Sequence, residues 1–206
     1  MSKINCKFCN EKFGVRAIID HVSSCIPNYL NDKSGYLIEF TSTSFITKKT
    51  YQMIALFGSN CKFRHIDKFL KKKWCRCCNH ISTIEFLKNI DKINQKSIKF
   101  NSLISKYEYN NNFLYCYDMG STLNIQVKIL KKFEGIEKNT NIELLYQNEP
   151  HKIKCKCKGN AIYIYDYDFY CDKCINDLEE PEFLINLVNS PRIGMCSYGF
   201  IPLHIL

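Results

Sequence analysis

The chain has 206 residues, of which 46% are apolar and 14% aromatic, and its formal net charge is +9. This composition excludes an intrinsically disordered chain, which has too few apolar residues to form a core. No segment approaches the ~18 continuous apolar residues of a membrane-spanning helix, so we expect no membrane span. The basic charge favours a partner with a negative surface, either a nucleic acid or an acidic protein.

The thirteen cysteines constrain both the compartment and the chemistry. The first residues lack the apolar stretch of a signal peptide, so we expect a cytoplasmic protein whose thiols stay reduced. An odd number of cysteines cannot pair completely within one chain, which indicates metal binding or burial instead. The chain is expected to comprise a zinc finger over 1–27, an α+β body over 35–150, a zinc ribbon over 151–178, and a C-terminal segment over 179–206 that packs on the body.

The N-terminal unit predicts a small zinc finger. Cys6 and Cys9 are separated by two residues, and His21 and Cys25 follow with three residues between them. A Cys-x2-Cys turn directs two thiolates to one point, and residues four positions apart lie on one face of a helix. The unit resembles the zinc-finger family with two cysteines and two histidines, with Cys25 in place of the last histidine. A helical hairpin with incidental cysteines is the alternative.

The body is predicted to contain an antiparallel sheet with helices. Alternating or β-branched segments predict strands over residues 36–40, 50–57, 113–119, 122–130 and 142–146. Ser59 and Asn60 are positioned to cap a helix that continues to about Trp74, and a further short helix is predicted over 83–94. Helical spacing predicts one buried stripe on the first helix, formed by Phe63, Ile66, Leu70 and Trp74.

The second cysteine unit predicts a zinc ribbon. Cys155 and Cys157 form one knuckle, Cys171 and Cys174 form another, and two short strands are predicted between them. Four thiolates repel one another without a metal, and zinc supplies folding energy of order 10 kcal/mol in small zinc peptides. A redox-active dithiol is the alternative, but it needs a low-pKa thiol near a helix start, which this segment does not indicate.

A third group of possible ligands follows the predicted helix. Cys77, Cys78 and His80 are close in sequence, although adjacent cysteines do not easily bind the same ion. The alternative is that the remaining cysteines are small, buried apolar residues, as free cysteine often is.

Three signatures resemble a group of largely uncharacterised bacterial and archaeal proteins that carry an N-terminal zinc finger. They are an aromatic residue followed by Cys-Cys-x-His (74–80), Tyr-x-Tyr-Asp-x-Gly-Ser-Thr (115–122) and Asn-Ser-Pro-Arg-x-Gly-x-Cys-x-Tyr (189–198). Asn79 and Met119 depart from the glycine and phenylalanine that are usual there. The second signature also resembles passenger proteins of plasmids and transposons. The resemblance implies an α+β body and a third metal cluster drawn from Cys77, Cys78, His80 and Cys196.

Catalytic motifs are missing from the sequence, and we lean towards a non-catalytic protein. There is no His-Glu-x-x-His helix, phosphate-binding glycine loop or nucleophile elbow, and no zinc-deaminase pattern. A hidden site would combine His80, Asp118 and the turn 189–192. Asp118 beside Gly120 is also typical of a hairpin turn, and Arg192 is also typical of a surface residue.

The favoured hypothesis is a zinc-containing nucleic-acid-binding protein, associated with RNA or the ribosome. A lone finger reads only about 3 base pairs, which disfavours sequence-specific DNA binding. The residues expected to contact phosphates are Arg64, Lys68, Lys71, Lys72, Lys73, Lys154, Lys156, Lys158 and Arg192. One alternative is a protein-interaction adaptor that uses the zinc modules as docking surfaces. Another is a component of a mobile element or defence system.

Overall fold

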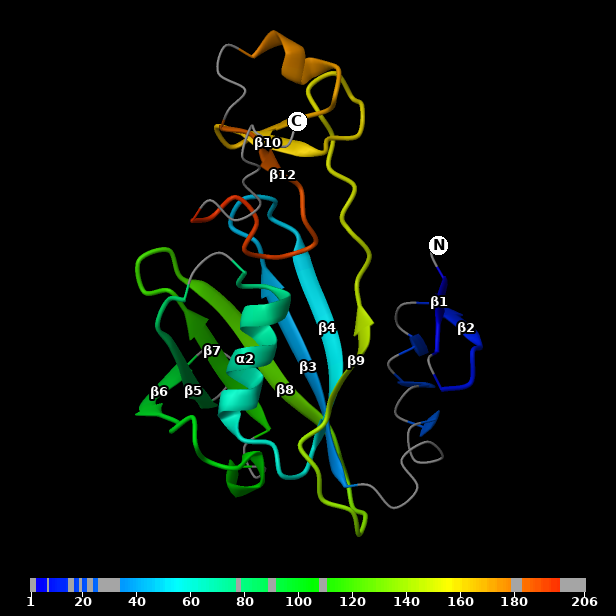
Figure 1. Ribbon diagram of the computed structural model, residues 1–206, viewed down its shortest axis with the longest axis vertical. Coiled ribbons are helices and arrows are strands. Elements are labelled where there is room, and N and C mark those ends of the chain that lie inside the picture. Colours follow the sequence, from blue (N-terminus) through cyan, green and yellow to red (C-terminus); the bar gives the residue numbers. More distant parts are fainter. Residues whose placement is uncertain are drawn as a thin grey trace.

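The computed structural model describes residues 3–6, 8–14, 17–18, 20–21, 24–25, 34–76, 79–88, 92–107, 111–178 and 183–196. Its centre is a seven-stranded antiparallel sheet in the order β6-β5-β7-β8-β3-β4-β9 (Figure 1). The strands are β3 (Gly35–Thr43), β4 (Thr50–Gly58), β5 (Ser82–Lys88), β6 (Lys92–Ser97), β7 (Asn112–Tyr117), β8 (Leu123–Phe133) and β9 (Ile142–Gln147).

Strand β8, in the middle of the sheet, shows why these segments are extended. Leu123, Ile125 and Val127 are buried, whereas Asn124 and Gln126 between them are exposed. Successive side chains of a strand point to opposite faces, so this alternation directs all the apolar residues to one side. The first part of β8 therefore has one apolar face, and its opposite face is polar as far as Lys128.

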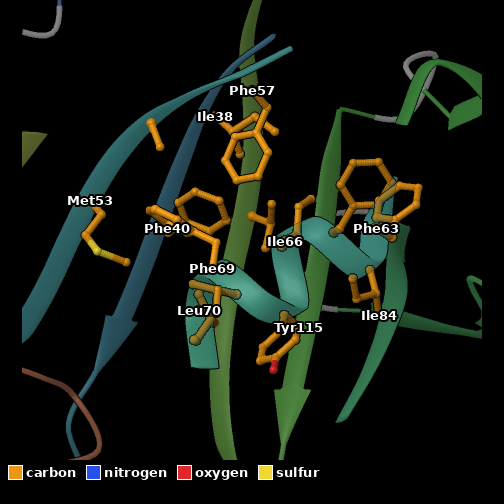
Figure 2. Close-up of a cluster of buried hydrophobic side chains, with 14 of the residues drawn as sticks. Ile38, Phe40, Met53, Phe57, Phe63, Ile66, Phe69, Leu70, Ile84 and Tyr115 are labelled. Carbon is orange, nitrogen blue, oxygen red and sulfur yellow. The ribbon is translucent and has the colours of Figure 1, made fainter. Parts of the chain in front are cut away.

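Helix α2 (Phe63–Lys73) covers this apolar face (Figure 1). Its buried residues are Phe63, Ile66, Phe69 and Leu70, and they meet aromatic side chains of the sheet (Figure 2). Phe69 packs against Phe40 and Phe57 with both pairs of ring centroids 5.5 Å apart. The 3-10 helix η1 (Ile104–Tyr107) packs against the same core. The rings of Tyr107 and Phe63 have their centroids 5.6 Å apart.

The N-terminal unit packs on the opposite face of the sheet. Strands β1 (Lys3–Asn5) and β2 (Lys12–Gly14) form a short hairpin, and the described residues between 17 and 25 are helical. Cys6 and Ile18 are buried in a second core together with side chains of β3, β4, β8 and β9. This N-terminal unit, which we call the finger, is thus attached to the body by apolar contacts as well as by the covalent chain.

The C-terminal cysteine unit forms a separate three-stranded sheet. Strands β10 (Tyr163–Tyr165) and β11 (Asp168–Tyr170) make a hairpin, and β12 (Ile185–Asn186) pairs with β10 from the other side. The 3-10 helix η2 (Cys174–Asp177) follows the hairpin. This unit, which we call the ribbon, lies beyond one end of the large sheet, to which an extended segment after β9 connects it (Figure 1).

The predicted fold class is confirmed: an antiparallel sheet with helix α2, an N-terminal Cys/His unit and a C-terminal unit with four cysteines. Most of the regular secondary structure in the described residues consists of strands. The division into parts at residues 27, 150 and 178 stays a prediction. None of the helices in the described residues is long and apolar enough to cross a membrane.

Two local predictions were wrong. The segment 83–94 is not helical but forms strands β5 and β6, because its side chains alternate between buried and half-buried from Ser82 to Leu87. Helix α2 begins at Phe63 and not next to Ser59 or Asn60. The Ser59 hydroxyl instead lies 2.6 Å from the Ser34 hydroxyl, so it is engaged with the start of β3.

Candidate metal centres

The first candidate centre lies in the finger. The β1–β2 turn brings Cys6 and Cys9 together: the Cys6 amide donates to Glu11 at 2.8 Å and the Asn10 amide to the Cys6 carbonyl at 2.9 Å. Asn10 has a φ of 59°, a left-handed conformation that asparagine tolerates better than most residues. This tight turn directs both thiol groups to one side, where the helical residues His21 and Cys25 complete the group.

The four ligand atoms of this tetrad lie within 4.8 Å of one another. Cys9 Sγ is 3.2 Å from His21 Nε2, close to the ~3.5 Å between sulfur and nitrogen that tetrahedral zinc with ordinary bond lengths requires. The ring of Phe13 stacks on the His21 ring with centroids 3.8 Å apart, and this stacking fixes the orientation of the imidazole. The tetrad therefore has both convergent ligands and a support for its histidine.

Thiol acidity differs within this tetrad. Burial acts to raise the pKa of Cys6, but hydrogen bonds from the backbone amides of Phe8 and Cys9 lower it below its ordinary value. The pKa of Cys25 is raised to about 11 by burial and by its contacts with Cys9 and Cys6. Without a cation, the Cys25 thiol therefore stays protonated at neutral pH.

The second candidate centre lies in the ribbon. Cys155 and Cys157 belong to a tight turn in which the Cys155 amide donates to Gly159 at 3.0 Å and the Lys158 amide to Cys155 at 2.8 Å. A Cβ on Gly159 would lie 3.3 Å from Cys157 Sγ and 3.6 Å from Cys171 Sγ. Glycine at this position therefore lets the backbone approach the sulfur cluster closely.

The sulfurs of Cys155, Cys157, Cys171 and Cys174 also lie within 4.8 Å of one another. Cys157 and Cys171 are 3.5 Å apart, far beyond the ~2.05 Å of a disulfide and near the ~3.8 Å edge of a tetrahedral zinc–thiolate site. The backbone amide of Cys157 is the main cause that lowers the pKa of Cys155 to about 6. Contacts with Cys157, Cys155 and Cys171 raise the pKa of Cys174 to about 12.

A third group joins His80, Asp118 and Cys196, whose ligand atoms also lie within 4.8 Å of one another. His80 Nε2 is 3.2 Å from Cys196 Sγ and 3.6 Å from Asp118 Oδ2. The structure thus brings together two of the residues predicted for a third metal site, and it adds Asp118, which the sequence did not identify as a ligand. Cys77 and Cys78 lie outside the described residues.

The predicted phosphate contacts occupy different environments. Arg64, Lys68 and Lys72 are exposed on helix α2, whereas Lys71 forms an ion pair with Asp67 at 3.3 Å and Lys73 is half-buried. Lys68, Lys72 and Lys73, with His65, line a groove of about 380 Å³ that Phe69 and the β9 residues Ile142 and Leu144 complete. The sequence did not predict this groove, because it depends on how α2 lies against β9.

On the ribbon, Lys154, Lys156 and Lys158 are exposed as expected. Lys156, however, forms an ion pair with Asp168, and Lys154 Nζ donates to Asn160 Oδ1 at 3.0 Å. Residues 151–178 contain five lysines and four aspartates, so the difference is only one positive charge. The ribbon is therefore much less basic than the cluster of lysines around its first knuckle suggested.

The assignment of Arg192 to a nucleic-acid surface was wrong. Its side chain is completely buried and donates to the carbonyl of Ser121 and to Asp118 Oδ2, both at 2.5 Å. Its guanidinium also lies 5.2 Å from the centre of the Tyr117 ring. Arg192 follows Pro191 in a turn, and its contacts with Tyr117, Asp118 and Ser121 enclose a residue type that is usually exposed.

The remaining described cysteines, Cys61, Cys75 and Cys116, are all buried, which agrees with the alternative interpretation of leftover cysteines as small apolar residues. Burial raises the pKa of Cys61 to about 11, so this thiol is protonated at neutral pH. Cys61 and Cys75 pack in the core between α2 and the sheet, and within the described part of the chain none of the three joins a group of possible metal ligands.

The fold and the two tetrads define a protein with two Cys/His groups that are consistent with two zinc sites, carried on an antiparallel-sheet body. No protein-family model matches the chain, and no curated protein matches its sequence. The three-signature resemblance therefore stays a prediction. The structure is similar to the crystal structure of MM3350, a protein of unknown function from Methanosarcina mazei Go1, with a TM-score of 0.45 and 14% identity over 56% of this chain and 69% of that chain.

Proposed function

We propose that the protein binds two structural zinc ions, one in each tetrad, and that it binds nucleic acid, with RNA preferred to DNA. The convergence of four ligand atoms in each tetrad is the observation that carries the zinc assignment. Both tetrads offer four protein ligands, which is the coordination of structural zinc sites and leaves no position for a substrate.

The nucleic-acid part of the proposal rests on helix α2 and the groove beside it. Helix α2 contains Arg64 and four lysines but only one acidic residue, Asp67. Its exposed cations lie along one side, and the groove adds half-buried apolar side chains of β9. A basic groove with an apolar floor suits a single strand, because it can contact both phosphates and bases. Single-stranded segments are what RNA-binding proteins mostly recognise, which favours RNA over duplex DNA.

The ribbon supports the second candidate, a protein-interaction adaptor. Ile162, Tyr167 and Phe183 expose 39%, 69% and 56% of their surfaces there. A zinc ion bound by four thiolates carries a net charge of −2, which makes the ribbon with its metal slightly acidic. An exposed apolar surface without excess positive charge is better suited to a protein than to a phosphate backbone.

Zinc content is tested by elemental analysis of the purified full chain. We expect Cys9→Ser and Cys157→Ser each to remove one zinc equivalent, whereas Cys116→Ser, which changes a buried cysteine outside the tetrads, should remove none. An unchanged zinc content in the two tetrad variants would reject the zinc assignment.

Nucleic-acid binding is tested by fluorescence anisotropy with labelled single-stranded RNA and DNA over a salt series. The double variant Lys68→Glu/Lys72→Glu should weaken binding strongly. It should also make the slope of log affinity against log salt concentration less steep by about 1.4, because each phosphate contact on a single strand contributes about 0.7 to that slope. The control Lys49→Glu/Lys128→Glu has the same change of charge at exposed residues outside the groove. Equal losses in both double variants, or no binding at low salt, would reject the groove and favour the adaptor.

A further inference from the structure

We propose that His80, Asp118 and Cys196 form a third metal site, which binds a zinc-class divalent cation and ties the C-terminal segment to the sheet. This site goes beyond the two tetrads of the proposed function. Its three residues come from the chain before β5, from the turn between β7 and β8, and from the end of the described chain. His80 and Cys196 are 116 positions apart, so only the folded state brings them together.

The distances fit a common ion better than they fit direct hydrogen bonding. A tetrahedral zinc with ordinary bond lengths places a sulfur and a nitrogen ligand about 3.5 Å apart, and a nitrogen and an oxygen ligand about 3.3 Å apart. The observed separations are 3.2 Å for Cys196 Sγ and His80 Nε2, and 3.6 Å for Asp118 Oδ2 and His80 Nε2. The second separation exceeds the range of a hydrogen bond but is ordinary for two ligands of one ion.

The same geometry argues against a catalytic Cys-His-Asp relay. In such a relay the imidazole uses one nitrogen towards the nucleophile and the other towards the carboxylate. Here Cys196 Sγ and Asp118 Oδ2 both approach Nε2 of His80. Ligand atoms that converge on one side of a ring indicate a shared ion instead.

The carboxylate of Asp118 is held in position by its neighbours. Arg192 and Ser121 donate to Oδ2, at 2.5 and 2.6 Å, and the Gly120 amide donates to Oδ1 at 3.0 Å. Hydrogen-bonded carboxylates of this kind are common around metal sites, where outer partners fix the orientation of each ligand. Since Arg192 already balances its charge, Asp118 is the weakest of the three ligands, and the thiol and imidazole provide most of the affinity.

His80 and Cys196 are accessible to an ion. The side chain of His80 is 34% exposed, and Cys196 is exposed. The backbone amide of His80 donates to the Tyr117 hydroxyl at 3.3 Å, so replacement of the His80 imidazole leaves this anchor of the loop intact. Variants at both positions are therefore suitable for a test in the full chain.

The decisive experiment is zinc stoichiometry of the zinc-replete full chain by elemental analysis. We expect three equivalents in the wild type and two in His80→Ala, in Cys196→Ser and in the double variant, because all three changes remove the same ion. Cys116→Ser is the matched control and should retain three. Two equivalents in the wild type that His80→Ala and Cys196→Ser leave unchanged would overturn the third site.

A second measurement uses the reactivity of Cys196. The full chain is treated with iodoacetamide in the presence of zinc, and the alkylated peptide is quantified by mass spectrometry, with circular dichroism to confirm folding. Cys196 should be protected in the wild type and alkylated in His80→Ala, and equal alkylation in the two proteins would contradict the proposal. The tetrad ions are tested separately by Cys9→Ser and Cys157→Ser, so this site and the proposed function can fail independently.

Discussion

Arg192 and Asp118, 74 positions apart in the sequence, form a buried ion pair that joins the C-terminal segment to the turn between β7 and β8. The segment is held at two further points. The Ser190 hydroxyl donates to the Trp74 carbonyl at 2.8 Å, and the Asn189 amide side chain donates to the Asn148 carbonyl at 2.6 Å. These contacts explain why the Asn-Ser-Pro-Arg motif is polar although the structure buries Ser190 and Arg192.

The first prediction concerns this ion pair. Arg192→Met should lower the free energy of unfolding by about 3–5 kcal/mol, because it removes the cation that compensates the mostly buried Asp118 carboxylate. The measurement is urea unfolding at neutral pH with zinc present. Lys132→Met is the control: it removes the exposed pair with Glu134 and should cost no more than about 1 kcal/mol. A loss for Arg192→Met as small as that of the control would refute the prediction.

The second prediction concerns the close packing at the end of β4. A Cβ on Gly58 would lie 2.1 Å from the Asn139 side-chain oxygen and 2.3 Å from the Asn139 carbonyl oxygen. The side chain can rotate away, but the backbone cannot, so we expect Gly58→Ala to destabilise the protein by about 1–3 kcal/mol. Thermal unfolding would measure this loss. Gly14→Ala, where a Cβ meets nothing within 4 Å, is the control and should have little effect.

The third prediction is a pH dependence at the start of helix α2. The Lys62 amide donates to His65 Nδ1 at 2.9 Å, which requires a neutral imidazole. Burial, and then the charges of Arg64, Lys68 and Lys62, lower the pKa of His65 below its ordinary value of 6.5. The unfolded chain therefore takes up the proton first as the pH falls. The contribution of His65 to stability is complete above about pH 6.5 and declines as the pH falls through the lowered pKa.

The variant His65→Gln tests this dependence, since glutamine keeps an acceptor at the third helical position but does not titrate. Urea unfolding at pH 7.5 and 5.5 should show a smaller decrease in stability for His65→Gln than for the wild type. Acid also weakens zinc binding, but it does so in both proteins, so the difference between them reports His65. Equal decreases would show that the hydrogen bond at the helix start contributes nothing.

The fourth prediction concerns removal of the metals. The hydrophobic cluster around the ribbon's cysteines is small, with Ile153, Cys155 and Ala161 as its buried members among the described residues. The core between α2 and the large sheet is extensive. A chelator should therefore abolish amide protection in β10 and β11 while β3 and β8 remain protected in hydrogen-exchange experiments. Protection in the ribbon that survives chelation would mean that the ribbon folds without zinc. Simultaneous loss in both regions would mean that the sheet depends on the metals.

Several elements could be predicted from local patterns. Strands β3, β4, β7, β8 and β9 were identified because apolar and β-branched residues recur along them, and helix α2 was identified because Phe63, Ile66 and Leu70 recur at helical spacing. The segment 83–94 was misassigned because a short apolar run fits either a helix or a strand. Its pairing with β7, for example Ile84 opposite Tyr115, decided in favour of a strand.

By itself, the sequence determined the residues of both tetrads, because a knuckle or a helical turn brings its ligands together over a few residues. It also determined the class of the body through the periodicity of its strands. Only the tertiary structure decided that Arg192 is buried, that α2 and β9 form a basic groove, and that His80, Asp118 and Cys196 meet. These relationships join residues far apart in the chain, and they depend on which sheet face each element covers, which local spacing does not specify.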